Sequence, residues 1–142
     1  MATTLKTLYD TDFAEWAIHA AKLLRAGRLD ELDLENVAEE IEDLARRQKS
    51  AVRSQLTRML EHKIKQTIQP ERDGNSWRRS IAGARIKIQR DLEDSPSLRP
   101  YLEQNLQRFY LDAVKLAVIE TGLEHAKIPE ECPWTIEALL TD

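Results

Sequence analysis

The sequence has 142 residues, a mass of 16.4 kDa and a formal net charge of −4, and a chain of this size can bury a core without disulfides or metal ions. Its single cysteine, Cys132, excludes an internal disulfide framework and a cysteine-based zinc site. No segment approaches the roughly 20 apolar residues that cross a bilayer, and the N-terminus lacks the apolar stretch of a signal peptide. These features predict a single cytoplasmic domain over residues 1–142.

The first two predicted helices differ greatly in length, although the apolar spacing of both is helical. One helix is expected to begin near Thr11, behind a cap at Asp10 or Thr11, and to stop at the left-handed residue Gly27. The second follows Asp33, and no glycine or proline interrupts residues 34–69. At 1.5 Å per residue this segment would be about 54 Å long, more than a compact domain of this size holds. We therefore expect the helix either to bend between residues 46 and 54 or to pack against a partner.

Two further long helices and a short one complete the prediction. A third helix carries the apolar stripe of residues 77–92, behind an N-cap at Asn75 or Ser76. A fourth helix covers residues 97–121, with Ser97 as its N-cap and Pro100 in its first turn. A short last helix is expected within 133–140. The sequence thus predicts an all-α fold: an antiparallel bundle of four main helices, one of them long, plus a short C-terminal helix.

The charges are strongly segregated along the chain. Residues 1–45 have a net charge of −7, residues 46–90 of +10, and residues 91–142 of −7. The positive segment forms the end of the long helix and the helix after it, which we call the basic hairpin (residues 46–90). This hairpin either contacts an anionic partner or is neutralised by the acidic helices beside it.

The nucleic-acid interpretation rests on the cations around the turn of the basic hairpin. Phosphate groups attract such side chains, and an aromatic residue among them could stack on a base. Trp77 is that aromatic residue, but its position on the apolar stripe favours a place in the core. The overall pI of about 5.5 weighs against this interpretation. The candidate nucleic-acid-binding residues are Lys65, Arg72, Arg78 and Arg79.

Two further patterns suggest chemistry. Arg58 and His62 lie four residues apart on the long helix, loosely like the arginine–histidine pairs of small helical ribonucleases, in which histidine is the general base. Glu39 and Asp43 also share a helix face, and such carboxylates hold Mg²⁺ in helical phosphohydrolases. Neither pattern is accompanied by a distinctive second group of residues. Acidic residues in a first helical turn are also favoured by the helix dipole alone. We expect no metal or other cofactor.

Short segments along nearly the whole chain form a specific combination. They are residues 9–13, 23–28, 33–36, 39–42, 69–70, 94–98, 121–123 and 132–135, with Trp16, His62, Lys65, Trp77 and Tyr110 between them. In this order they resemble the bacterial family labelled domain of unknown function 29. The resemblance implies an all-helical fold, and it carries no activity, cofactor or catalytic residue over to this chain.

Three functions of different classes follow from the sequence. The preferred one is a non-enzymatic helical interaction module that binds a protein partner or a second copy of itself. The second is a nucleic-acid-binding protein that uses the basic hairpin. The third is a small helical ribonuclease or phosphohydrolase, with His62 and Arg58 or Glu39 and Asp43 as working residues. We expect no membrane partner.

Overall fold

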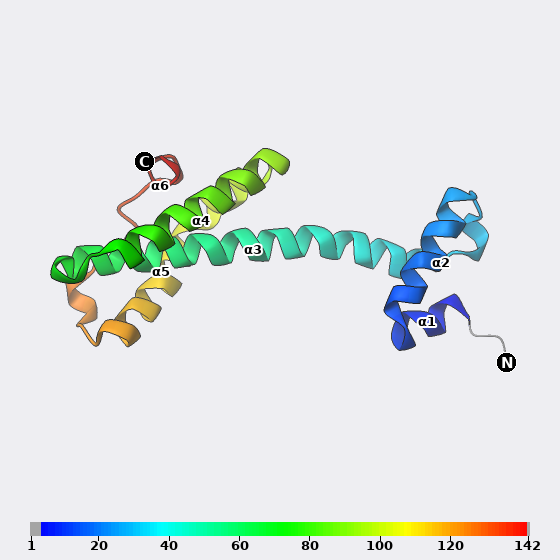
Figure 1. Ribbon diagram of the computed structural model, residues 1–142, viewed down its shortest axis with the longest axis horizontal. Coiled ribbons are helices and arrows are strands. Elements are labelled where there is room, and N and C mark those ends of the chain that lie inside the picture. The colour runs from blue at the N-terminus through cyan, green and yellow to red at the C-terminus, as the bar shows by residue number, and fades with distance from the viewer. Residues whose placement is uncertain (1–3, 142) are drawn as a thin grey trace. The chain divides into compact units, whose positions relative to one another are not determined.

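The computed structural model describes residues 4–141 and confirms the all-α prediction (Figure 1). No strand occurs in the described range. The helices are α1 (Leu5–Thr11), α2 (Phe13–Arg25), α3 (Leu34–Ile68), α4 (Asn75–Asp94), α5 (Leu98–Thr121) and α6 (Ile136–Leu140), with 3-10 turns η1 (Leu29–Glu31), η2 (Pro70–Arg72) and η3 (His125–Lys127). None of these described helices is long and apolar enough to span a membrane.

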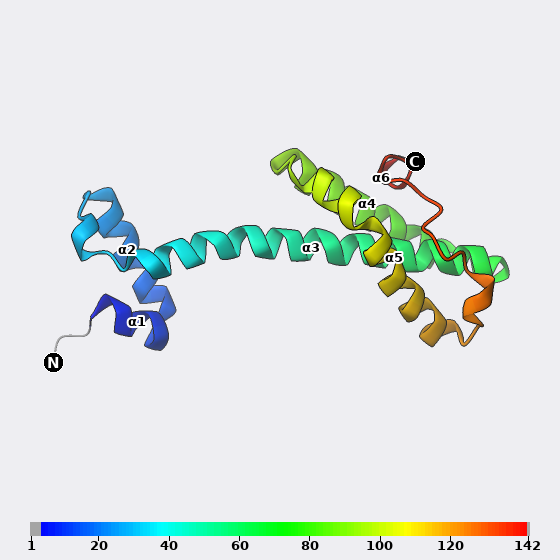
Figure 2. The same ribbon diagram turned by 180° about the vertical axis from the view of Figure 1, so that it is seen from behind.

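The long helix is a single uninterrupted element. α3 has 35 residues, from Leu34 to Ile68, and Figure 2 shows its coil without a break. The chain divides into two compact units within this helix, and the boundary falls between Arg47 and Gln48. The N-terminal unit is described over residues 4–47 and the C-terminal unit over residues 48–141. The expectation of one domain over 1–142 stays a prediction.

The N-terminal unit contains a helix that the sequence reasoning missed. α1 precedes the predicted helix, and its end is fixed by Asp12, whose backbone leaves the helical region at φ −149°. The Asp12 carboxylate accepts a hydrogen bond from the Glu15 amide at 3.1 Å and so caps α2, in place of Asp10 or Thr11. Beyond α2, Gly27 adopts the expected positive φ of 70°.

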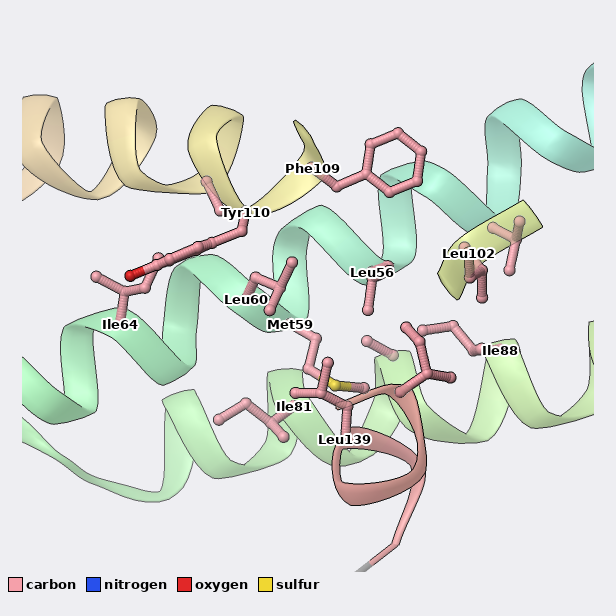
Figure 3. Close-up of a cluster of buried hydrophobic side chains, with 14 of the residues drawn as sticks. Leu56, Met59, Leu60, Ile64, Ile81, Ile88, Leu102, Phe109, Tyr110 and Leu139 are labelled. Atoms are coloured by element: carbon pink, nitrogen blue, oxygen red, sulfur yellow. The ribbon is translucent and has the colours of Figure 1, made fainter. Parts of the chain in front are cut away.

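The C-terminal unit holds the main hydrophobic core, in which four helices take part (Figure 3). Leu56, Met59 and Leu60 of α3 point toward the side chains of α4 and α5, and Leu139 of α6 closes the cluster. α6 is held by α4, because the Arg85 guanidinium and the Gln89 amide donate to its last carbonyl groups at 3.0 and 2.7 Å. This core fixes how the faces of α3, α4 and α5 meet.

Two further predicted helix caps are wrong, while two further predicted helix ends are confirmed. α4 begins at Asn75 behind Gly74, so neither Asn75 nor Ser76 is its cap. Ser97 has helical backbone angles and makes no side-chain cap, because the turn at Ser95 and Pro96 already accepts the first amides of α5. Gly122 ends α5 with φ 69°, and α3 ends before Pro70, as expected.

Candidate functional site

Arg58 and His62 lie in an open groove between α3 and α5 of the C-terminal unit. The groove has a volume of about 540 Å³. Its lining combines side chains of both charge signs, three of which meet at one point. Those three are Glu61 and Lys65 of α3 and Glu120 of α5.

Lys65 is buried, with 2% of its surface exposed. Its Nζ lies 2.7 Å from Glu120 Oε2 and 3.3 Å from Glu61 Oε1, and it sits 6.0 Å above the ring of Trp77. Glu61 is one turn before Lys65 on α3, whereas Glu120 comes from the last turn of α5. The structure therefore separates Lys65 from the exposed cations of the basic hairpin, because its ammonium group faces two carboxylates.

The pKa values of the two carboxyl groups around Lys65 are shifted in opposite directions. Burial raises the pKa of Glu61, and a hydrogen bond with Glu120 raises it further. The hydrogen bond from Lys65 lowers the pKa of Glu120. At neutral pH Glu120 is thus the carboxylate that balances the lysine charge most directly.

His62 has no group that would orient it as a general base among the described residues. Burial first, then the charges of Lys65 and Arg58, lower the pKa of its imidazole. Its Nδ1 atom is buried and has no hydrogen-bond partner in the described part of the chain. A catalytic histidine is usually held by a third group at this nitrogen. The groove brings Arg58 and His62 together without that arrangement.

The cations at the turn of the basic hairpin are dispersed. Arg78 pairs with Asp73 at 3.2 Å, and Asp73 also accepts a hydrogen bond from Gln66. Arg72 is exposed in η2. Arg79 lines a second groove, between α3 and α4. Arg79 thus combines a place in a groove with the lack of an ion-pair partner among the described residues, whereas Lys65 and Arg78 are paired with carboxylates.

This second groove, which we call the α3–α4 groove, has a volume of about 210 Å³. Its described lining contains three cations and no carboxylate, although a groove on an acidic protein would be expected to include both signs. Sequence reasoning had singled out only Arg58 and Arg79 among these residues. The lining residues are Gln55, Arg58, Arg79, Ser80, Gly83, Ala84 and Lys87.

Glu39 and Asp43 are already paired within the N-terminal unit. Nη2 of Arg46 lies 2.7 Å from Glu39 Oε1 and 2.6 Å from Asp43 Oδ1. The neighbouring Glu40 accepts a hydrogen bond from Tyr9 at 2.6 Å, which raises the pKa of that phenol to about 12. No group of three potential metal-ligating side chains occurs among residues that the structure describes. Arg46 thus occupies the position that a cation would take between Glu39 and Asp43.

The N-terminal unit exposes most of its large apolar side chains. Trp16 and Ala20 are its buried residues within 4–47, and Trp16 packs against the rings of Tyr9 and Phe13. Ile41 and Leu44, for comparison, are 61% and 63% exposed. The large apolar residues exposed in this unit are Phe13, Ile18, Leu24, Leu29, Leu34, Ile41 and Leu44.

Comparison with known proteins identifies one family. No curated protein and no solved structure matches the chain. The family described as "Domain of unknown function DUF29" matches residues 8–142, which is essentially the whole chain and includes both grooves and most of the N-terminal unit. The resemblance to this family is thereby confirmed, and the chain belongs to the DUF29 family.

Proposed function

We propose that this protein is a non-enzymatic helical interaction module that self-associates through its N-terminal unit. The observation that carries the proposal is the exposed apolar surface of residues 13–44, which holds seven of the eleven large apolar residues exposed in the described chain. Isolated exposed apolar residues are normal, whereas a concentration of them in one small unit favours a contact surface. A partner that covers this group would supply the core that the unit lacks.

The exposed apolar residues of α3 follow helical spacing. Leu34, Ala38, Ile41 and Ala45 fall on one face of the helix, with Leu44 at its edge, and all five are exposed. Farther along α3 the same spacing leads to Val52, Leu56 and Met59, which are buried in the core. Residues at this spacing form part of the core where other helices cover them. We call the uncovered part of this face, residues 34–45, the open α3 face. It has the pattern of a helix that packs on another helix.

The charge order along α3 favours a second copy of the chain in antiparallel orientation as the partner. Residues 34–45 carry five carboxylates and no lysine or arginine, whereas residues 46–60 carry five lysines and arginines and no carboxylate. Antiparallel pairing of two such helices about the charge boundary between residues 45 and 46 brings the acidic segment of one beside the basic segment of the other. In this register the open α3 face of each copy lies along the exposed side of residues 46–57 of its partner. Parallel pairing would place like charges together. Opposite charges at the edges of an apolar seam set helix orientation in this way.

The described groups that resemble catalytic residues support a structural role. Lys65 is held between two carboxylates, Arg46 lies between Glu39 and Asp43, and His62 lacks an orienting partner at Nδ1 among the described residues. The single cysteine and the family relationship support a bacterial, cytoplasmic location, which we include in the proposal.

Sedimentation equilibrium of three proteins tests the proposal. The wild-type chain is expected to form dimers at micromolar concentration. The double variant Ile41→Gln/Leu44→Gln removes two apolar side chains from the open α3 face of each copy. Each buried side chain of this kind contributes about 1.5–3 kcal/mol, so the dimer should weaken at least a hundredfold. The two new amides leave the net charge unchanged.

The matched control is Ile119→Gln on α5, because Ile119 is 80% exposed and lies in the C-terminal unit. This variant should dimerise like the wild type. A wild-type chain that stays monomeric at about 100 μM, a concentration well above the Kd of most specific dimers, would refute the proposal. Equal weakening by the double variant and the control would show that copies meet elsewhere.

A further inference from the structure

The α3–α4 groove presents unpaired positive charge. Arg58 reaches it from α3, and Arg79 and Lys87 reach it from α4. All three side chains are exposed, and none forms a hydrogen bond or ion pair with a residue that the structure describes. Most other cations of the basic hairpin do have partners, such as Asp73 for Arg78 and the ring of Trp134 for Lys63. The groove therefore gathers charge that the fold has not neutralised.

Gly83 gives the groove an open floor. It lies in the interior of α4 with ordinary helical backbone, where glycine destabilises a helix by roughly 0.5–1 kcal/mol relative to alanine. A Cβ atom built at Gly83 would meet nothing within 4 Å, so close packing does not require glycine there. The absence of a side chain leaves the α4 backbone accessible between Arg79 and Lys87. Ser80 and Gln55 add neutral hydrogen-bond donors at the same place.

The arrangement of the cations fits a chain of anions better than one small anion. Arg79 and Lys87 are eight residues apart, which corresponds to a rise of about 12 Å along the helix. Arg90, which is exposed, continues the same face of α4 beyond Lys87. Residues 75–90 contain five lysines and arginines and no carboxylate. Successive phosphates of a backbone can follow cations that are spread along a helix in this way, whereas one small anion would leave part of this charge unpaired.

We propose that the α3–α4 groove binds the phosphodiester backbone of a nucleic acid without reading its sequence. Arg58, Arg79 and Lys87 contact the phosphates, and Gly83 lets the backbone approach α4. Guanidinium groups suit phosphate because their fork of N–H donors matches its oxygens. This activity goes beyond the proposed self-association and uses none of the residues of the open α3 face.

Fluorescence anisotropy with a labelled single-stranded RNA of mixed sequence, about 20 nucleotides long, tests the proposal. Three phosphate contacts predict a slope of about −2 for log affinity against log salt, so affinity falls about twentyfold between about 50 and 200 mM salt. Gly83→Glu places a carboxylate between Arg79 and Lys87 at a position with open space. It should weaken binding about tenfold and reduce the slope by about one.

Gln104→Glu on α5 is the matched control, because it adds the same charge at an exposed position outside the groove. It should bind RNA as the wild type does. Circular dichroism of both variants should show unchanged helix content, which separates lost binding from lost folding. Ile41→Gln/Leu44→Gln should retain RNA binding, so failure of the self-association proposal and failure of this one are distinguishable.

Three results would overturn the proposal. The first is no binding at about 50 mM salt, where electrostatic contacts are strongest. The second is an equal loss of affinity in Gly83→Glu and Gln104→Glu. The third is displacement of the RNA by polyglutamate at equal charge concentration, which would make the groove a surface for acidic protein segments.

Discussion

Replacing Lys65 by methionine tests whether the buried ammonium group stabilises the C-terminal unit. Methionine keeps the length and the apolar stem of lysine but leaves Glu61 and Glu120 facing each other without a cation. Removal of one partner from a buried ion pair costs about 3–5 kcal/mol. The Glu120 side chain is 62% exposed and retains hydration, so we expect a lower cost, about 2–3 kcal/mol.

The loss should depend on pH in a defined direction. Lys65 lowers the pKa of Glu61, so the variant raises that pKa further above its already raised wild-type position. A carboxyl group with a raised folded-state pKa favours folding below its unfolded-state pKa, and this contribution is lost as pH rises through the folded-state pKa. The destabilisation by Lys65→Met should therefore be largest near neutral pH and shrink as the pH falls and Glu61 takes up a proton.

Urea unfolding followed by circular dichroism, at neutral pH and near pH 4.5, measures both effects. Lys87→Met is the matched control, since Lys87 is exposed and has no described ion-pair partner; its effect should stay within about 0.5 kcal/mol. A Lys65→Met protein as stable as the wild type at neutral pH would show that the buried ammonium group does not stabilise the C-terminal unit. A destabilisation that grows on acidification would contradict the expected dependence on the protonation of Glu61.

Two further predictions concern single residues beside the grooves. Gly83→Ala should raise the free energy of unfolding by roughly 0.5–1 kcal/mol, because the added Cβ meets open space in a helix interior, and a lower stability in urea would contradict this. The pKa of His62, followed by the NMR shift of its ring protons, should lie below 6.5 and rise in Arg58→Gln. A lowered histidine pKa contributes stability above the unfolded-state pKa that is lost as pH falls through the folded-state pKa. A His62 pKa above 6.5 would contradict the burial of its imidazole.

Local signals in the sequence were sufficient for most of the fold. Gly27, Gly122 and Pro70 interrupt the helical pattern, so the ends that they set were predicted correctly. α1 was missed because its seven residues are too few for a clear apolar period and Asp12 separates it from α2. The continuity of α3 followed from the lack of glycine and proline over 34–69.

The candidate sites were predicted less well, because they depend on how helices meet. Arg58 and His62 share a helix and could be paired from spacing alone. Glu120 is 55 residues beyond Lys65 in the sequence, so no local pattern indicated that it would neutralise this lysine. The positive charge of the basic hairpin was visible, but the sequence did not show which cations lack partners. The spacing of Arg79, Gly83 and Lys87 along one helix is the signal that could have indicated the α3–α4 groove.

Self-association through the open α3 face can be tested by locating the contact between two copies of the chain. A nitroxide label at Glu42→Cys, beside the open α3 face, in a Cys132→Ser background can be followed by double electron–electron resonance. Two packed helices lie about 8–10 Å apart, so labels on paired α3 helices should give a defined short intermolecular distance. Self-association through the open α3 face should give this distance in the wild-type background, and the distance should be lost when Ile41→Gln/Leu44→Gln is added. A singly labelled protein without intermolecular dipolar coupling at about 100 μM, where a specific dimer would be populated, would contradict self-association through this face.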